Sequence, residues 1–341
     1  MSLTQATIRI GESVPWPDAL SRAVISQLVG RTRRSLSAAP TDDADFARGM
    51  SVYPVAVHTD DANAQHYEIP AEFFALILGP QRKYSCCLYE SDTSSLIDAE
   101  ENALRVTAEH ALLRDGQRIL ELGCGWGSLS LWMARHYPAS RIVSVSNSHS
   151  QRQHICDQAR KEGLPNLEVI TSDMNEFIPS GQFDRIVSIE MFEHMANWRP
   201  LLERLRKALK PDGHLFLHVF SHRSASYRFD AANRGDWIAQ HFFTGGIMPG
   251  HSLIRQFPDI FSVDAEWRWS GTQYEKTAND WLANYDRNAD AIFDILLRVY
   301  GTEARIWQRR WRLFFLATAG LFGHARGEEW GVSHYRLRPA G

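Results

Sequence analysis

Apolar and polar residues follow two different patterns along the chain. Between about Asp18 and Ala39, apolar side chains recur every three or four residues, which predicts a helix with one apolar stripe for packing. From Gln117 onward, short apolar runs alternate with helical segments. The runs predict five strands, at Arg118–Leu122, Arg141–Val145, Leu167–Ile170, Arg185–Ile189 and Leu215–Phe220. This pattern predicts an α/β fold in which helices cover both faces of a mostly parallel sheet.

The same pattern divides the chain into an appendage and a catalytic unit. Residues 1–64 are expected to form an N-terminal helical appendage, because its helix is followed by two polar, linker-like segments, Thr41–Phe46 and Thr59–Asn63. Residues 65–341 are expected to form one domain. Within it, residues 222–327 are rich in Trp, Tyr and Phe, and we expect them to contain a substrate lid inserted before a final strand at Gly331–Leu337.

Composition narrows the classes of partner. The 341 residues are 44% hydrophobic and can bury a full core, and the net charge of -3 gives no strong positive field for nucleic acid. The four cysteines form no CxxC pair, so neither a zinc site nor a disulfide framework is expected. The N-terminus lacks the pattern of a secretory signal, and we therefore expect a cytoplasmic protein. Composition leaves a homodimer open.

The most apolar run, Leu313–Phe322, is too short to be a membrane span. It has about half of the roughly 20 residues that a helix needs to cross a bilayer. We predict a buried helix there and no transmembrane segment. Three arginines precede the run, at 309, 310 and 312, so peripheral membrane contact is the alternative.

Glycines follow the first predicted strand at a spacing suited to ligand binding. Gly123, Gly125 and Gly127 lie between that strand and a helical run, where the backbone must turn sharply and its amides can approach a ligand. Tight turns with glycine are common, so this pattern alone is weak evidence. The dinucleotide fingerprint has the spacing GxGxxG, whereas this loop has GxGxG. Dinucleotide binding is therefore disfavoured.

The loop Glu121–Gly127, with the sequence ELGCGWG, resembles the first motif of class I S-adenosylmethionine-dependent methyltransferases. Most members of that fold end the second strand with an acidic residue that holds the ribose. Here Ser146 and Asn147 stand there with Gln151 nearby, as in the cyclopropane fatty acid synthases and their relatives. Six segments in the same order extend the resemblance to that superfamily, and most closely to the coclaurine N-methyltransferase type: Tyr84–Cys87, Glu121–Gly127, Ser188–Met195, Leu217–Phe220, Phe242–Pro249 and Tyr274–Trp281.

The resemblance implies a Rossmann-like, mostly parallel seven-stranded sheet and a cofactor, S-adenosyl-L-methionine, which leaves as S-adenosyl-L-homocysteine. It implies twelve cofactor-binding residues: Tyr84, Ser85, Glu121, Gly123, Gly125, Ser146, Asn147, Gln151, Asp173, Met174, Asn175 and Ile189.

Glu190, Glu193 and His194 follow the fourth predicted strand and are candidate catalytic residues. If the segment turns helically, positions i, i+3 and i+4 share one face. A protonated amine has no lone pair, so an amine methyltransferase gains from a base and from anionic groups, and crowding or burial raises a carboxylate pKa toward the working range. No metal is required. A solvated acidic loop is the alternative interpretation.

Two substrate classes stay open, a small amine and an unsaturated acyl chain. The resemblance implies that a glutamate at the position of Glu190 is typical of the amine N-methyltransferases. However, Glu193, His218, Tyr274 and the backbone of Cys86 match positions that bind bicarbonate in cyclopropane synthases, where the anion is the base in C-methylation or cyclopropanation of the acyl chain. His218 could instead be a hydrogen-bonded core histidine, and Tyr274 could simply pack. A cofactor-binding pseudoenzyme is a third reading.

Overall fold

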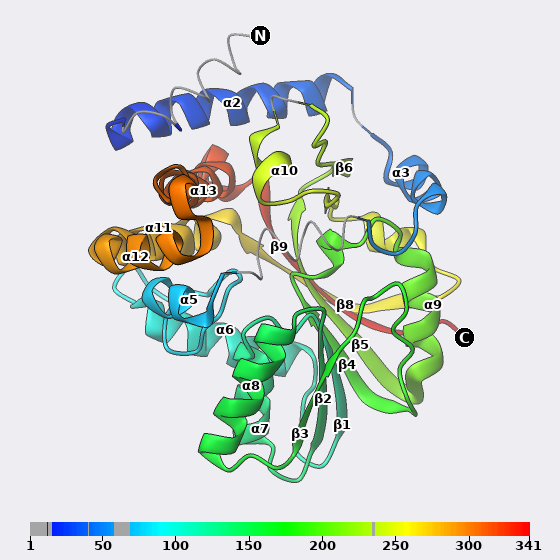
Figure 1. Cartoon of the computed structure of the whole chain (residues 1–341). Coiled ribbons are helices and arrows are strands. Elements are labelled where there is room, and N and C mark those ends of the chain that lie inside the picture. Colours follow the sequence, from blue (N-terminus) through cyan, green and yellow to red (C-terminus); the bar gives the residue numbers. More distant parts are fainter. Residues whose placement is uncertain (1–11, 13–15, 40, 58–68, 234–235) are drawn as a thin grey trace.

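A seven-stranded sheet forms the centre of the structure, a computed structural model that describes residues 12, 16–39, 41–57, 69–233 and 236–341 (Figure 1). The strand order is β3-β2-β1-β4-β5-β9-β8. The first five strands in this order are parallel, and β9 runs antiparallel to both β5 and β8. The strands are β1 (Arg118–Leu122), β2 (Arg141–Ser146), β3 (Leu167–Thr171), β4 (Phe183–Ile189), β5 (Leu209–His222), β8 (Phe261–Ser270) and β9 (Trp330–Pro339), and β6 (Tyr227–Arg228) pairs with β7 (Ile247–Met248) in a small separate sheet.

Helices cover both faces of the large sheet, as the alternating pattern predicts. On one face, Leu104 of α6 and Trp132 of α7 pack with Ile119 and Phe216, and α8 lies beside α7. On the other face, Leu202 of α9 packs among the strands. The helices of these layers are α6 (Leu96–His110), α7 (Ser128–His136), α8 (His149–Glu162) and α9 (Trp198–Ala208).

Further helices gather above the carboxyl edge of the sheet (Figure 1). α13 packs against α11, α12 and α2, and α2 lies across the top of the molecule. These helices are α2 (Asp18–Ala38), α3 (Asp43–Gly49), α5 (Ala71–Ile77), α10 (Trp237–His241), α11 (Gly271–Arg287), α12 (Ala289–Tyr300) and α13 (Ala304–Phe322). Short 3₁₀ turns are η1 (Met50–Val52), η2 (Phe192–His194), η3 (Leu253–Gln256), η4 (Gly301–Glu303) and η5 (His324–Gly327). Among the described helices, none combines the length and the apolar run that spanning a bilayer requires.

The structure differs from the predicted organisation in two places. The polar segment Thr41–Phe46 is not simply a link, because α3 begins there and the Asp42 side chain accepts a hydrogen bond from the Ala44 amide at its N-terminus. The predicted lid segment, residues 222–327, also supplies β8, the edge strand of the central sheet. The segment Thr59–Asn63 and the predicted boundary at residues 64 and 65 lie outside the described residues.

Candidate active site

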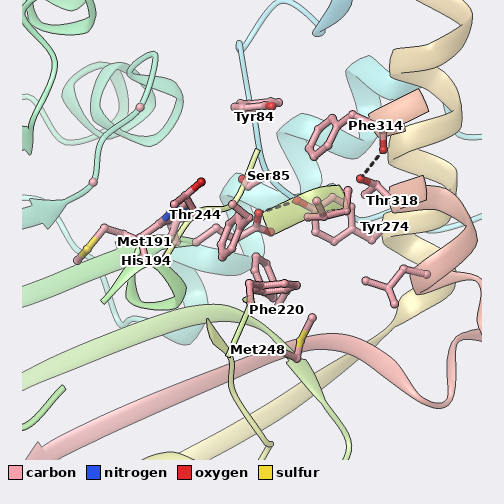
Figure 2. Close-up of a pocket in the computed structure, with 18 of the residues that line it drawn as sticks. Tyr84, Ser85, Met191, His194, Phe220, Thr244, Met248, Tyr274, Phe314 and Thr318 are labelled. Atoms are coloured by element: carbon pink, nitrogen blue, oxygen red, sulfur yellow. Dashed lines mark hydrogen bonds between the residues drawn. The ribbon is translucent and has the colours of Figure 1, made fainter. Parts of the chain in front are cut away.

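A cavity of about 590 Å³ lies at the carboxyl edge of the parallel strands. Its floor is formed by the residues that follow β1, β2, β3 and β4, and α2, α11 and α13 line its upper part. Figure 2 shows Tyr84, His194, Phe220 and Tyr274 converging on this space from separate elements. Open α/β sheets bind ligands at this edge, so the cavity lies where the fold predicts a site.

The glycine loop after β1 requires glycine at its ends. Gly123 and Gly127 have φ values of 76° and 84°, a region that residues with a Cβ rarely adopt. A Cβ on Gly123 would lie 2.6 Å from the Cβ of Met191, and one on Gly127 would lie 2.6 Å from Ile155. At Gly125, with a φ of 51°, a Cβ would meet nothing within 4 Å. The loop is therefore packed tightly at both ends and open to the cavity at its centre, where its backbone can approach a ligand closely.

The polar groups after β2 are held by one another. The Ser146 hydroxyl donates to Gln151 Oε1 at 2.7 Å and accepts from the Ser148 amide at 3.0 Å. This arrangement fixes a neutral hydroxyl and amide where most class I enzymes place a ribose-binding acid. Glu121, under the glycine loop, is buried and accepts hydrogen bonds from the hydroxyls of Ser130 and, at 2.8 Å, Ser144. Burial raises the pKa of Glu121 to about 7.

Eleven of the twelve predicted cofactor residues line the cavity: Tyr84, Ser85, Glu121, Gly123, Gly125, Ser146, Asn147, Gln151, Asp173, Met174 and Ile189. Asn175 is not among its lining residues. Its side-chain amide instead accepts from the Ala56 backbone N–H at 3.0 Å and donates to the Ala56 carbonyl at 3.1 Å. Asn175 thus ties the segment at Ala56 to the loop after β3.

Glu190 directly follows β4 and has a left-handed backbone with a φ of 46°. Its amide donates to the His218 carbonyl at 2.8 Å. Its side-chain Oε1 accepts from the Cys86 amide at 2.9 Å and lies 3.2 Å from His218 Nε2, and Oε2 accepts from the Tyr274 hydroxyl at 2.7 Å. Three separate elements therefore hold one carboxylate at the edge of the cavity.

The two carboxyl groups of the cluster lie in different environments. Glu193 is fully buried, and its Oε1 accepts from the Phe220 amide at 2.6 Å. Its Oε2 has no hydrogen-bond partner among the described residues. Burial and the neighbouring charge of Glu190 hold the pKa of Glu193 well above its usual value. Burial also raises the pKa of Glu190, but Lys83 and the donors from Cys86 and Tyr274 oppose that rise. Glu190 is therefore the better base and Glu193 the better neutral carboxyl.

The predicted catalytic residues split into two groups. Glu190, His194 and Tyr274 line the cavity, whereas Glu193 and His218 lie fully buried behind them. Residues 192–194 form a 3₁₀ turn and not an α-helix, so Glu193 points toward β5 while His194 contacts the Phe243 ring, 4.3 Å away between centroids. The three side chains therefore do not share one α-helical face, although Glu190 interacts electrostatically with both Glu193 and His194.

Sequence reasoning missed two features of the site. Buried Lys83 donates from Nζ to the Ser85 hydroxyl at 2.6 Å and to the Cys86 carbonyl at 2.7 Å, and so fixes the segment whose amide binds Glu190. Its place beside Tyr84–Cys87 was the available signal. The apolar stripe of α2 was expected only to pack, yet Val24, Ile25 and Leu28 line the cavity.

Comparison with known proteins places the chain among methyl-transferring enzymes. A family model described as mycolic acid cyclopropane synthetase matches residues 57–326. (S)-coclaurine N-methyltransferase from Thalictrum flavum subsp. glaucum is 34% identical over 285 residues, covering 82% of this chain and 79% of that protein. Pavine N-methyltransferase from the same plant is 30% identical, with coverages of 84% and 82%. Cyclopropane-fatty-acyl-phospholipid synthase from Escherichia coli strain K12 is 31% identical, with coverages of 65% and 55%.

Solved structures agree with these sequence matches. The crystal structure of coclaurine N-methyltransferase bound to N-methylheliamine and SAH has a TM-score of 0.91 at 32% identity, and the match covers 98% of this chain and 99% of that one. A cyclopropane synthase from Mycobacterium tuberculosis has a TM-score of 0.70 at 23% identity, with coverages of 83% and 99%, which is a likeness of fold alone.

Proposed function

Because the chain belongs to the mycolic acid cyclopropane synthetase family and is an S-adenosylmethionine-dependent methyltransferase, we propose that its methyl acceptor is the nitrogen of a small aromatic or alicyclic amine. Relatives named as N-methyltransferases of coclaurine and pavine match more than four fifths of the chain. The cyclopropane synthase from Escherichia coli matches a smaller share.

The position of the Glu190 carboxylate carries the proposal. It accepts hydrogen bonds from the Cys86 amide and the Tyr274 hydroxyl and lies within hydrogen-bonding distance of His218. These are three of the four groups that the resemblance assigns to a bicarbonate in cyclopropane synthases. The fourth, Glu193, lies beside it in the same buried cluster. The protein's own carboxylate thus takes the place of the anion, which supports amine chemistry over C-methylation of an acyl chain.

The side chains of the site suit the deprotonation of a bound ammonium. Glu190 attracts the cation and accepts its proton, which leaves a nitrogen lone pair free to form the new bond to carbon. Neutral Glu193 adds no second charge that would compete for the cation. Phe220, Phe243 and Phe314 give the cavity aromatic walls that exclude water and accept apolar rings. S-adenosylmethionine, when bound, supplies the methyl group and leaves as S-adenosylhomocysteine, so placing the two reactants in line provides the remaining acceleration.

An amine panel tests the proposal directly. The protein is incubated with S-adenosylmethionine and secondary amines that include coclaurine and heliamine, the parent of N-methylheliamine. We expect a product heavier by one methyl and an equal amount of S-adenosylhomocysteine. A matched reaction with vesicles of unsaturated phospholipid should give no methylated or cyclopropanated acyl chain. Methylation of the lipid without any amine product would reverse the assignment, and cofactor binding without either product would favour the pseudoenzyme reading.

Glu190→Gln separates binding from chemistry. The amide keeps the size of the side chain but cannot take up the proton, so kcat should fall by about a hundredfold or more. Affinity for S-adenosylmethionine, measured by calorimetry, should change less than about threefold.

We further propose that the chain acts in the cytoplasm, which its four free cysteines support.

A further inference from the structure

Two histidines and a tryptophan form a row across three strands behind Glu190. His218 of β5 is the direct partner of His334 in β9, and His334 is the direct partner of Trp267 in β8. Directly opposed residues of an antiparallel pair point to the same face of the sheet. His110, the last residue of α6, stacks on Trp267 with ring centroids 3.7 Å apart and an interplanar angle of 6°. The row therefore extends from the neighbourhood of Glu190 to the C-terminal end of α6, which packs on this face of the sheet.

Hydrogen-bond distances connect these rings in series. Glu190 Oε1 lies 3.2 Å from His218 Nε2, His218 Nδ1 lies 2.9 Å from His334 Nε2, and His334 Nδ1 lies 2.9 Å from His110 Nδ1. His218 and His334 are fully buried, whereas His110 is partly exposed. We call His218, His334 and His110 the histidine file. It runs without a gap from the carboxylate in the cavity to a ring that reaches solvent.

The file has only two self-consistent proton patterns. Burial lowers the pKa of His218 and His334 well below the ordinary value and that of His110 to about 4, so each ring is neutral with one N–H. A hydrogen bond between two ring nitrogens needs one proton between them. All three rings must therefore donate toward Glu190, or all three must donate away from it.

Charged groups beside the file disfavour storing a proton on it. Lys83 lies near its inner end and lowers the pKa of both His218 and His334. Arg336 lowers the pKa of His110 at the outer end, while Glu109 raises it. Tyr274 bonds to the other oxygen of Glu190 and leaves Oε1 to face His218. An added proton is therefore unstable on any of the three rings, and its transfer along the file to solvent is favoured.

We propose that the histidine file is a proton relay, which carries the proton released by the amine from Glu190 to solvent and rests on the proposed amine methylation. In the starting pattern each ring donates away from protonated Glu190. The proton on Glu190 Oε1 moves to His218 Nε2, that on His218 Nδ1 to His334 Nε2, that on His334 Nδ1 to His110 Nδ1, and that on His110 Nε2 to water. One proton leaves, Glu190 is a carboxylate again, and each ring must return to the tautomer that donates away from Glu190 before the next turnover.

The relay explains why the buried rings have each other and Glu190 as hydrogen-bond partners, which a purely structural role does not require. A buried histidine needs partners for its polar atoms, but single hydroxyls or backbone groups would satisfy it. Here the partner of each buried ring is another titratable ring or the candidate base, and the series ends at solvent. Histidine is suited to shuttle protons because its two nitrogens can give and take a proton at opposite sides of the ring.

Two variants of the full-length protein test the relay with whichever amine it methylates. His334→Phe cuts the file at its centre with a ring of similar size, and His110→Ala removes the outer end. Both should lower kcat about tenfold or more near neutral pH and leave the KM for the amine and the affinity for S-adenosylmethionine within about twofold. Imidazole added to the buffer should restore most of the rate of His110→Ala. The loss in both variants should shrink at high pH, where the amine enters unprotonated and releases no proton.

His136→Ala is the matched control. His136 is also the last residue of its helix, α7, and its ring also stacks on a tryptophan, Trp132, with centroids 4.0 Å apart. It does not contact the file, so its removal should change kcat little, and imidazole should have no effect. A loss in His110→Ala that imidazole does not rescue and that persists at high pH would mean that the ring only supports the structure, which would overturn the relay.

Nitrogen-15 spectra of histidine-labelled protein test the file without any turnover. His218, His334 and His110 should show one shared polarity, with protons on Nε2, Nε2 and Nδ1, or on Nδ1, Nδ1 and Nε2. A mixed pattern would overturn the relay. Failure of the proposed function has a different signature, because the unmodified protein would then methylate no amine at all, whatever the spectra show.

Discussion

The hydroxyl of Tyr274 donates to Glu190 Oε2 across 2.7 Å, and so joins α11 to the residue that follows β4. This bond stabilises the charged form of Glu190 and lowers its pKa against the effect of burial. The pKa of the candidate base is therefore set in part by α11, a helix that also lines the cavity.

Tyr274→Phe should reduce kcat about tenfold near neutral pH, because a hydrogen bond to a charged group is lost. The pKa of Glu190 should rise. A base acts only when it is deprotonated, so the acidic limb of the kcat profile should move to higher pH. Tyr89→Phe is the control, since Tyr89 donates to Asp280 Oδ2 at the same distance of 2.7 Å but does not contact Glu190. Equal profiles for both variants would contradict this role of Tyr274.

Gly123→Ala should weaken S-adenosylmethionine binding at least about tenfold. The new Cβ would need a left-handed backbone, which costs about 1–2 kcal/mol, and would lie 2.6 Å from Met191. Calorimetry measures the affinity. Gly49→Ala serves for comparison, because Gly49 is helical and a Cβ there meets nothing within 4 Å. Unchanged affinity in Gly123→Ala would show that the loop accommodates the added Cβ and would contradict this prediction.

Glu121 should make the protein less stable as pH rises. Its folded pKa of about 7 lies above the ordinary value of 4.5, so the folded state holds the proton more tightly than the unfolded state. The stability it contributes is complete below about pH 4.5 and is lost as pH rises through about 7. Between pH 5 and pH 8, the free energy of unfolding should fall by about 2 kcal/mol more in the unmodified protein than in Glu121→Gln.

Denaturant titrations at the two pH values measure this difference. Glu176→Gln, at an exposed position, should leave the pH dependence unchanged. If Glu121→Gln loses stability between pH 5 and pH 8 as steeply as the unmodified protein, Glu121 is not the group that titrates.

Arg312 should matter for substrate affinity through α2. Its guanidinium bonds to Asp18 of α2 at 2.7 and 3.0 Å and to Asp286 of α11 at 2.8 Å, and α2 lines the cavity. Arg312→Ala should raise the KM for the amine about threefold, since partly exposed ion pairs contribute little each, and should leave kcat nearly unchanged. Arg105→Ala, in an exposed ion pair on α6, should have no effect on KM. A fall in kcat at constant KM would place Arg312 in the chemistry instead.

Local patterns predicted much of the fold, and the family resemblance supplied the residues expected on the cofactor side of the site. The strands β1 to β5 and β9 follow from short apolar runs, whereas the glycine spacing was weak evidence until the resemblance supported it. β8 was not predicted, because its exposed, alternating positions at the sheet edge lack an unbroken apolar run and its tryptophans, Trp267 and Trp269, suggested a lid. Such a strand is specified by its pairing with β9, which is a property of the whole sheet.

The catalytic side depends on long-range geometry that spacing does not contain. The turn after β4 is a 3₁₀ turn, which has about 3.0 residues per turn against about 3.6 in an α-helix, so Glu193 and His194 lie at different angles from Glu190 than an α-helix would give. The contact of His218 with His334 joins residues 116 apart in sequence, and it depends on the register of β5 with β9. The sequence marks His218 as a candidate but cannot give its partner.

The left-handed backbone of Glu190 bears on how the site could arise. Glycine adopts a φ of 46° freely, so a glycine at this position would keep the same turn after β4. Glycine and glutamate codons can differ by one nucleotide. A single mutation between these two residues would therefore add or remove the chain's own carboxylate at the cavity without altering the path of the backbone.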